Sequence, residues 1–114
     1  SIGVPLAVSA KKSFIAPSAT MTVHPVRTNG LMIGVPRMMN HFARMQSRIT
    51  DFVVNHSNIT PEKFTELMMN TKEMVTDVGS VISGERAVEV GLIDSIGNLG
   101  TVIESLYEMI DQTK

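Results

Sequence analysis

The sequence predicts an α/β fold whose strands are too few to complete a sheet, and three observations support this. Apolar and polar residues alternate over residues 20–24, which is the period-2 pattern of a strand. From Val35 onward, apolar residues recur at steps of three and four, as in a long amphipathic helix. Shorter helical segments then alternate with short apolar runs, an order typical of α/β proteins.

The first 24 residues are predicted to form one short helix and two short strands. Residues 2–10 are small and apolar, which indicates a buried helix, and Pro5 fits only its first turn. Residues 13–16 are predicted to form a short buried strand. In the strand over residues 20–24, His24 is the last residue before a proline, so its ring projects from a strand end.

Residues 35–54 are predicted to form a single helix that so small a chain cannot cover completely. At about 1.5 Å per residue, this helix would be about 30 Å long. Part of its apolar stripe would remain exposed, and a large exposed apolar patch marks an interaction surface. We therefore expect a homo-oligomer that assembles through this helix. The stripe consists of Val35, Met38, Met39, Phe42, Met45, Ile49, Phe52 and Val53.

The remaining residues predict three more helices and two short strands. A helix begins at Pro61 after the capping residue Thr60, and its apolar face consists of Phe64, Leu67 and Met68. Residues 81–82 are predicted to be a strand, followed by a helix over 84–90 that Ser83 caps and Gly91 closes. A strand is expected over residues 92–94, and Gly97 and Gly100 frame a turn after it. The last helix carries Val102, Leu106, Met109 and Ile110 on its apolar face.

Composition excludes several classes of function. The 114 residues suffice for one small domain, and a net charge of −1 without a basic stripe argues against a nucleic-acid partner. The absence of cysteine excludes disulfides, thiolate metal sites and a cysteine nucleophile. The three histidines have no metal-binding spacing, and no apolar run reaches the roughly 18 residues that span a bilayer. We expect neither a metal, a cofactor nor a transmembrane segment.

Three residues are candidates for catalysis, although each also fits an ordinary structural role. Ser1 opens a helix of small residues, where the helix dipole would favour a nucleophile and the Ile2 N–H could face an oxyanion. His24 could act as a general base, because histidine titrates near neutral pH. Asp77 lies in a polar turn and could orient an imidazole. The structural alternatives are a helix N-cap, a half-buried strand histidine and a turn-forming aspartate.

Four segments together resemble the Clp protease proteolytic subunit from its nucleophile onward. They are SIGVPLAVSA, SFIAPSATMTVHP, the long amphipathic helix and VISGERAVEVGLID, which cover nearly the whole chain. Among ClpP-like proteins, these segments are most similar in sequence to the translocation-enhancing group. SG-x-x-AVE-x-GLID is less specific, since it is shared with the wider ClpP/crotonase superfamily.

The resemblance implies a serine peptidase that cleaves peptide or protein substrates with a Ser1–His24–Asp77 triad and an oxyanion donor at Ile2. About two extra residues separate Asp77 from the following strand, so Glu73 is the alternative acid. The chain is then the C-terminal part of one ClpP-like domain, residues 1–114, and the long helix is the family's "handle". We expect the upstream half of the fold, with its oxyanion loop, to be missing, and these residues alone to be inactive. The resemblance also implies a bacterial cytoplasmic role in protein export, such as the clearance of signal peptides.

Three other functions compete with this interpretation. A crotonase-type acyl-CoA enzyme would share the fold, but it has no use for a serine–histidine pair at these positions. A Ser–Lys peptidase would use Lys11 or Lys12 as its base, and His24 would then have no catalytic role. A non-catalytic assembly domain would use only the methionine-rich stripe of the long helix.

Overall fold

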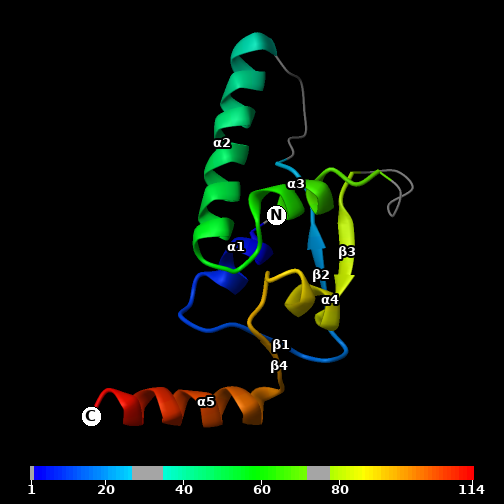
Figure 1. Ribbon diagram of the computed structural model, residues 1–114. Helices are drawn as coiled ribbons and strands as arrows, with labels where there is room; N and C mark the ends of the chain where they lie inside the picture. The colour runs from blue at the N-terminus through cyan, green and yellow to red at the C-terminus, as the bar shows by residue number, and fades with distance from the viewer. Residues whose placement is uncertain (1, 27–34, 72–77) are drawn as a thin grey trace.

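The computed structural model describes residues 2–26, 35–71 and 78–114 (Figure 1). Its principal extents are 55 × 31 × 25 Å, because two helices extend beyond the packed centre. The elements are α1 (Gly3–Val8), β1 (Phe14–Ile15), β2 (Thr20–Val23), α2 (Val35–Asn55), α3 (Pro61–Met68), β3 (Ser80–Ser83), α4 (Gly84–Glu89), β4 (Ser95–Ile96) and α5 (Leu99–Gln112).

The strands in the described part of the chain form two separate pairs. Strands β2 and β3 are antiparallel, with Thr20 opposite Ser83 and Val23 opposite Ser80. Strands β1 and β4 are parallel over two residues each. The alternation predicted for β2 is confirmed, since Val23 is buried while Thr20 and Thr22 are exposed. The mixed α/β class with short strands is thereby confirmed.

Helix α1 is shorter and more exposed than the sequence predicted. It has six residues, with Pro5 in its first turn as expected, and only Val8 is buried. Ile2 and Leu6 are 62% and 63% exposed. The prediction of a buried helix over residues 2–10 is therefore wrong, because α1 packs on α2 and β2 but leaves Ile2 and Leu6 exposed.

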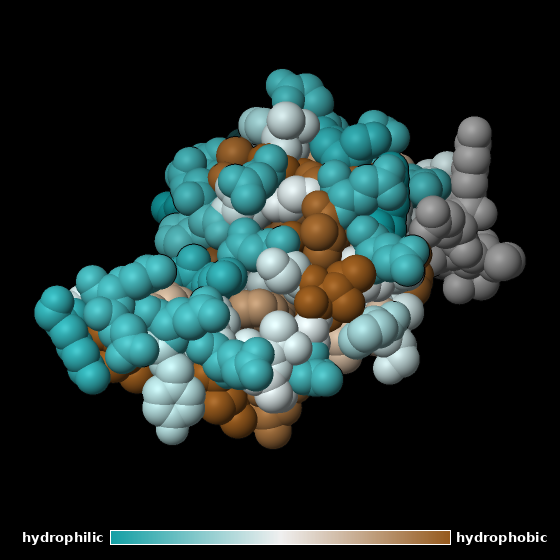
Figure 2. Space-filling view, turned by 60° about the horizontal axis from the view of Figure 1, so that its bottom comes forward, coloured by the Kyte–Doolittle hydropathy of each residue, from teal (hydrophilic) through white to brown (hydrophobic). Residues whose placement is uncertain are grey.

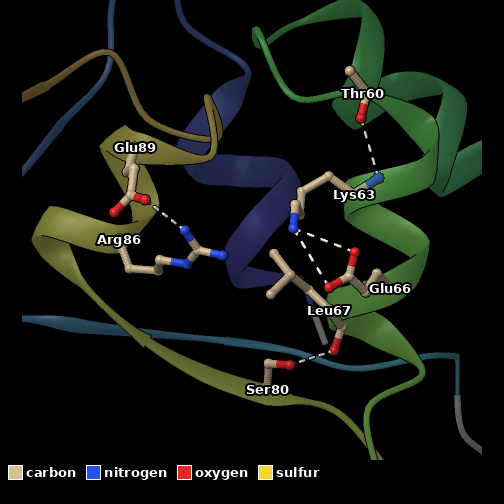
Figure 3. A network of polar contacts seen from close by, with 7 residues as sticks. All are labelled: Thr60, Lys63, Glu66, Leu67, Ser80, Arg86 and Glu89. Carbon is tan, nitrogen blue, oxygen red and sulfur yellow. Dashed lines mark hydrogen bonds and ion pairs between the residues drawn. The ribbon is translucent and has the colours of Figure 1, made fainter.

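Helix α3 packs into the core, and a hydrogen bond holds each of its ends, as Figure 3 shows. At its start, the Thr60 hydroxyl accepts a hydrogen bond from the Lys63 N–H at 3.1 Å, which confirms the predicted cap. Near its end, the buried Ser80 hydroxyl donates to the Leu67 carbonyl at 2.6 Å and links α3 to β3. The predicted apolar face is buried, and it consists of Phe64, Leu67 and Met68.

The segment after α4 forms differently from the prediction. Ser83 caps α4, and Gly91 follows it with φ +86°, as expected. The predicted strand over residues 92–94 is wrong, since β4 lies at Ser95–Ile96. The N–H groups of Leu92 and Ile93 both donate to the Ala87 carbonyl at 2.9 and 3.1 Å, so they close α4 instead of joining a ladder. Both side chains are nevertheless buried in the core.

Helix α2 has the predicted extent and is packed mainly at its C-terminal end. Val53 is fully buried there, and the helix contacts α1 and α3. Its first turns stand clear of the other elements in Figure 1. Met39 is 61% exposed and so lies off the half-buried part of the stripe. None of the helices in the described ranges is long and apolar enough to cross a membrane.

Helix α5 projects from the packed centre as an arm (Figure 1), and its apolar face is largely uncovered. Figure 2 shows apolar residues along its underside and polar residues above them. Gly100 lies inside the first turn of this helix, so the predicted turn between Gly97 and Gly100 is wrong. The Asn98 capping box with Thr101 starts the helix earlier than the glycine pattern indicated. Of the predicted face, Val102 and Met109 are half-buried. The exposed large hydrophobic residues of the helix are Leu99, Ile103, Leu106, Tyr107 and Ile110.

Candidate active site

His24 follows the last residue of β2 and lines a hollow beside α2. The side chain is half-buried, and the hollow has a volume of about 520 Å³. Ile2, at the start of α1, lies on the wall of the same hollow. The candidate base His24 therefore lines the same hollow as Ile2, the residue that follows Ser1 in sequence. Its other lining residues are Pro25, Val26, Met45, Gln46 and Ile49.

The protonation of the His24 ring follows from one of its hydrogen-bond partners. Nδ1 lies 2.8 Å from the carbonyl oxygen of Pro25. A carbonyl oxygen can only accept, so Nδ1 carries the hydrogen in this bond. In the neutral ring Nε2 then holds the lone pair, which is the tautomer that a general base acting through Nε2 requires.

Gly79 is in direct contact with the strand end that carries His24. Its φ is +141°, and a Cβ atom placed there would lie 2.5 Å from the Val23 carbonyl oxygen and 3.1 Å from the His24 Cβ. The Gly79 N–H donates to the Asn70 carbonyl at 2.7 Å. Only glycine fits both the backbone conformation and the close approach. The chain just before β3 thus passes directly beside His24.

Ser1, Asp77 and the alternative acid Glu73 lie outside the described residues. Their assignment as nucleophile and acid beside His24 therefore stays a prediction. Ile2 is described: it occupies the N-cap position of α1, where its carbonyl accepts from the Leu6 N–H at 3.1 Å. Its proposed role as an oxyanion donor stays a prediction.

Lys11 and Lys12, the alternative bases, lie at the far end of α1. Both are exposed and line a hollow against α5, apart from the one that contains His24. The Lys12 ammonium lies 5.5 Å from the centre of the Phe14 ring, a cation–π arrangement. These positions favour packing and surface roles over that of a catalytic base paired with the N-terminal residue.

The other two histidines have contacts of their own along α2. The rings of His41 and Phe42 lie 5.9 Å apart, and His56 stacks on Phe52 at 4.0 Å. The Nδ1 atom of His56 lies 2.8 Å from the Phe52 carbonyl oxygen, so this ring closes the end of the helix. In the part of the chain that the structure describes, no three histidine, aspartate or glutamate side chains gather closely enough to hold a metal ion.

The sequence analysis missed Gln46, which the structure places at this site. Its Oε1 accepts a hydrogen bond from the Val26 N–H at 2.7 Å, two residues after His24. The available signal was a polar residue directly following Met45, at the edge of an otherwise apolar stripe. A pattern of hydropathy cannot say which segment such an amide contacts.

The Clp protease family model matches residues 1–99, and the chain belongs to that family. Over 112 residues, 98% of the chain, it is 48% identical to the translocation-enhancing protein TepA of Halalkalibacterium halodurans. These residues make up 44% of that relative, so the chain spans less than half of its length. The resemblance to the ClpP family and to the translocation-enhancing group is confirmed, and most of α5 lies beyond the family match.

Proposed function

We propose that the whole protein is a serine endopeptidase of the ClpP type, with Ser1 as nucleophile, His24 as general base and Asp77 as the acid that orients it. The observation that carries this proposal is the surroundings of His24. Ile2, which follows Ser1 in sequence, shares its hollow. Gly79, two residues after Asp77, packs against the backbone of His24. Membership of the Clp protease family favours this chemistry over that of an acyl-CoA enzyme.

The proposed reaction passes through an acyl-enzyme. The Ser1 hydroxyl oxygen attacks the carbonyl carbon of the peptide bond while its proton passes to Nε2 of His24. The Ile2 N–H helps to hold the oxyanion, and the amine product leaves with the proton from His24. A water molecule then repeats the sequence in place of Ser1, releases the acid product and restores the free hydroxyl. No metal or organic cofactor is needed for these steps.

The first test uses a serine-directed phosphonate and three histidine variants of the full protein. We expect the phosphonate to label Ser1, as located by mass spectrometry, and His24→Ala to lower kcat/KM by about 10³-fold or more. His41→Ala and His56→Ala are the matched controls, and both should keep near-normal activity because their contacts lie outside the hollow. Labelling at another serine, or full activity in His24→Ala, would contradict the proposal.

We propose that α2 also forms the interface of a homo-oligomer. Its first turns stand away from the other elements, and Met39 leaves 61% of its surface exposed. Met45 is unsuitable for the test because it lines the hollow of His24. The double variant Met39→Lys and Phe42→Asp should sediment as a smaller species with native-like circular dichroism. Ser47→Asp, on an exposed position of the same helix, should stay assembled. An unfolded double variant, or one that stays fully assembled, would overturn this interface.

The name of the relative supports a role in protein export. TepA is called a translocation-enhancing protein. We propose that this protein acts in the bacterial cytoplasm on peptides that arise during export, including cleaved signal peptides. Comparison of the peptides that accumulate when His24→Ala replaces the wild-type protein in cells would test this. Accumulated peptides without any export signals among them would count against the role.

A further inference from the structure

The amide of Gln46 connects the middle of α2 to the segment that follows His24. Its Oε1 accepts from the Val26 N–H at 2.7 Å, and its Nε2 donates to the Thr50 hydroxyl at 3.2 Å, one turn further along the helix. Both contacts are partly buried. Since Thr50 takes the donor end of the amide, the acceptor end faces Val26.

The bond to Val26 acts on the same peptide unit that contacts the His24 ring. The Pro25 carbonyl and the Val26 N–H belong to a single peptide group, which is planar and rigid. His24 Nδ1 lies 2.8 Å from that carbonyl oxygen, while Gln46 accepts from that N–H. The two hydrogen bonds therefore hold opposite ends of one plane, and each polarises the peptide in favour of the other.

The ladder of the sheet does not hold this peptide in place. The pairing of β2 with β3 ends at Val23 opposite Ser80, just before His24. Pro25 has no N–H of its own to give to a ladder. The hydrogen bond from Val26 to Gln46 thus restrains the segment after the strand has ended, at the point where the ring must be oriented.

We propose that Gln46 is a positioning residue for the general base, and that it acts through the Pro25–Val26 peptide. By fixing that plane, Gln46 holds the Pro25 carbonyl at Nδ1 of His24, and the basic lone pair stays on Nε2. The carbonyl and the proposed acid Asp77 then accept from the same Nδ1–H, so the carbonyl is a second acceptor that helps the acid to orient the ring. This role rests on the proposed function, because it matters for catalysis only where His24 is the base. It also ties the catalytic histidine to α2, the helix proposed as the subunit interface.

The test compares two substitutions at Gln46 in the full-length protein. Gln46→Leu removes the acceptor and should lower kcat by about 10–10²-fold with little change in KM, because a misplaced base slows the chemical step. Gln46→Glu keeps an oxygen that can accept from the Val26 N–H. At pH values well above the acidic limb of the pH profile, its kcat should therefore be close to that of the wild type. Its negative charge favours the protonated imidazole, so that limb should move to higher pH. Thr50→Val is the matched control, since it removes only the outer partner, and it should change kcat by less than about threefold.

The outcomes separate this inference from the proposed function. If His24→Ala keeps its activity, the proposed triad fails whatever Gln46 does. If His24→Ala is inactive but Gln46→Leu matches the wild type in kcat and pH profile, the positioning role is wrong and the peptidase stands. Where Gln46→Leu loses its native circular dichroism, Gln46→Glu decides: an unshifted acidic limb overturns the inference, and a shifted limb with restored kcat supports it.

Discussion

Helices α3 and α5 have equally clear amphipathic patterns, but their apolar faces differ in how far they are buried. Helix α3 buries its apolar face in the core, with Phe64 only 3% exposed. Helix α5 leaves its face in the open, with Leu106 52% exposed and Leu99 74% exposed. A periodic pattern thus predicts that a helix has an apolar face, but it does not predict which part of the protein covers that face. For α5, the described residues cover Ser105 and partly cover Val102 and Met109, but they leave Leu99, Leu106 and Ile110 exposed.

The largest contrast is expected between two truncations of apolar side chains. Phe64→Ala should lower the free energy of unfolding by about 3–5 kcal/mol, because it removes a buried ring from the core and leaves a cavity. Leu106→Ala should change it by less than about 0.5 kcal/mol, as expected for an exposed side chain. Denaturant titrations of both variants measure the contrast. A cost for Leu106→Ala as large as that for Phe64→Ala would show that the α5 face is covered in the protein in solution.

Two buried serines give a second contrast of intermediate size. The Ser80 hydroxyl donates to the Leu67 carbonyl, so Ser80→Ala leaves a buried acceptor unpaired and should cost about 1–3 kcal/mol. Ser105 of α5 is also buried, but its hydroxyl finds no partner among the described residues. Ser105→Ala should therefore be neutral or slightly stabilising. The same titrations apply here, and a loss of more than about 1 kcal/mol for Ser105→Ala would reveal a partner for this hydroxyl.

The smallest contrast lies between the caps of the two helices. Thr60 and Asn98 both accept a hydrogen bond from the N–H three residues on, at 3.1 and 3.0 Å. Each substitution by alanine weakens its own helix by about 1 kcal/mol. Thr60→Ala should lower the global stability, because α3 belongs to the core. Asn98→Ala should speed amide exchange within α5 and leave the global unfolding midpoint unchanged, because a weakly packed helix frays locally. Equal global losses would mean that α5 unfolds together with the core.

Much of the local structure and the family could be predicted from the sequence, because these features depend on neighbouring residues. The extent of α2 follows from its three- and four-residue spacing, and the caps at Thr60 and Ser83 follow from hydroxyl groups placed before helical segments. The turn at Gly91 was also predictable, since glycine accepts a positive φ at low energy. Ser1, His24 and Asp77 were proposed from local motifs, and of these only the position of His24 is described.

Tertiary structure alone decided the features that depend on contacts between distant segments. The short strand β4 lies at Ser95–Ile96, while the N–H groups of Leu92 and Ile93, where a strand was expected, donate to the Ala87 carbonyl. The contact of Gly79 with the His24 strand and the bond from Val26 to Gln46 join residues whose separation along the chain carries no local signal. Hydropathy records whether a side chain avoids water. Which neighbour it meets is set by how the elements pack, and for Gln46 that neighbour is the peptide beside the candidate base.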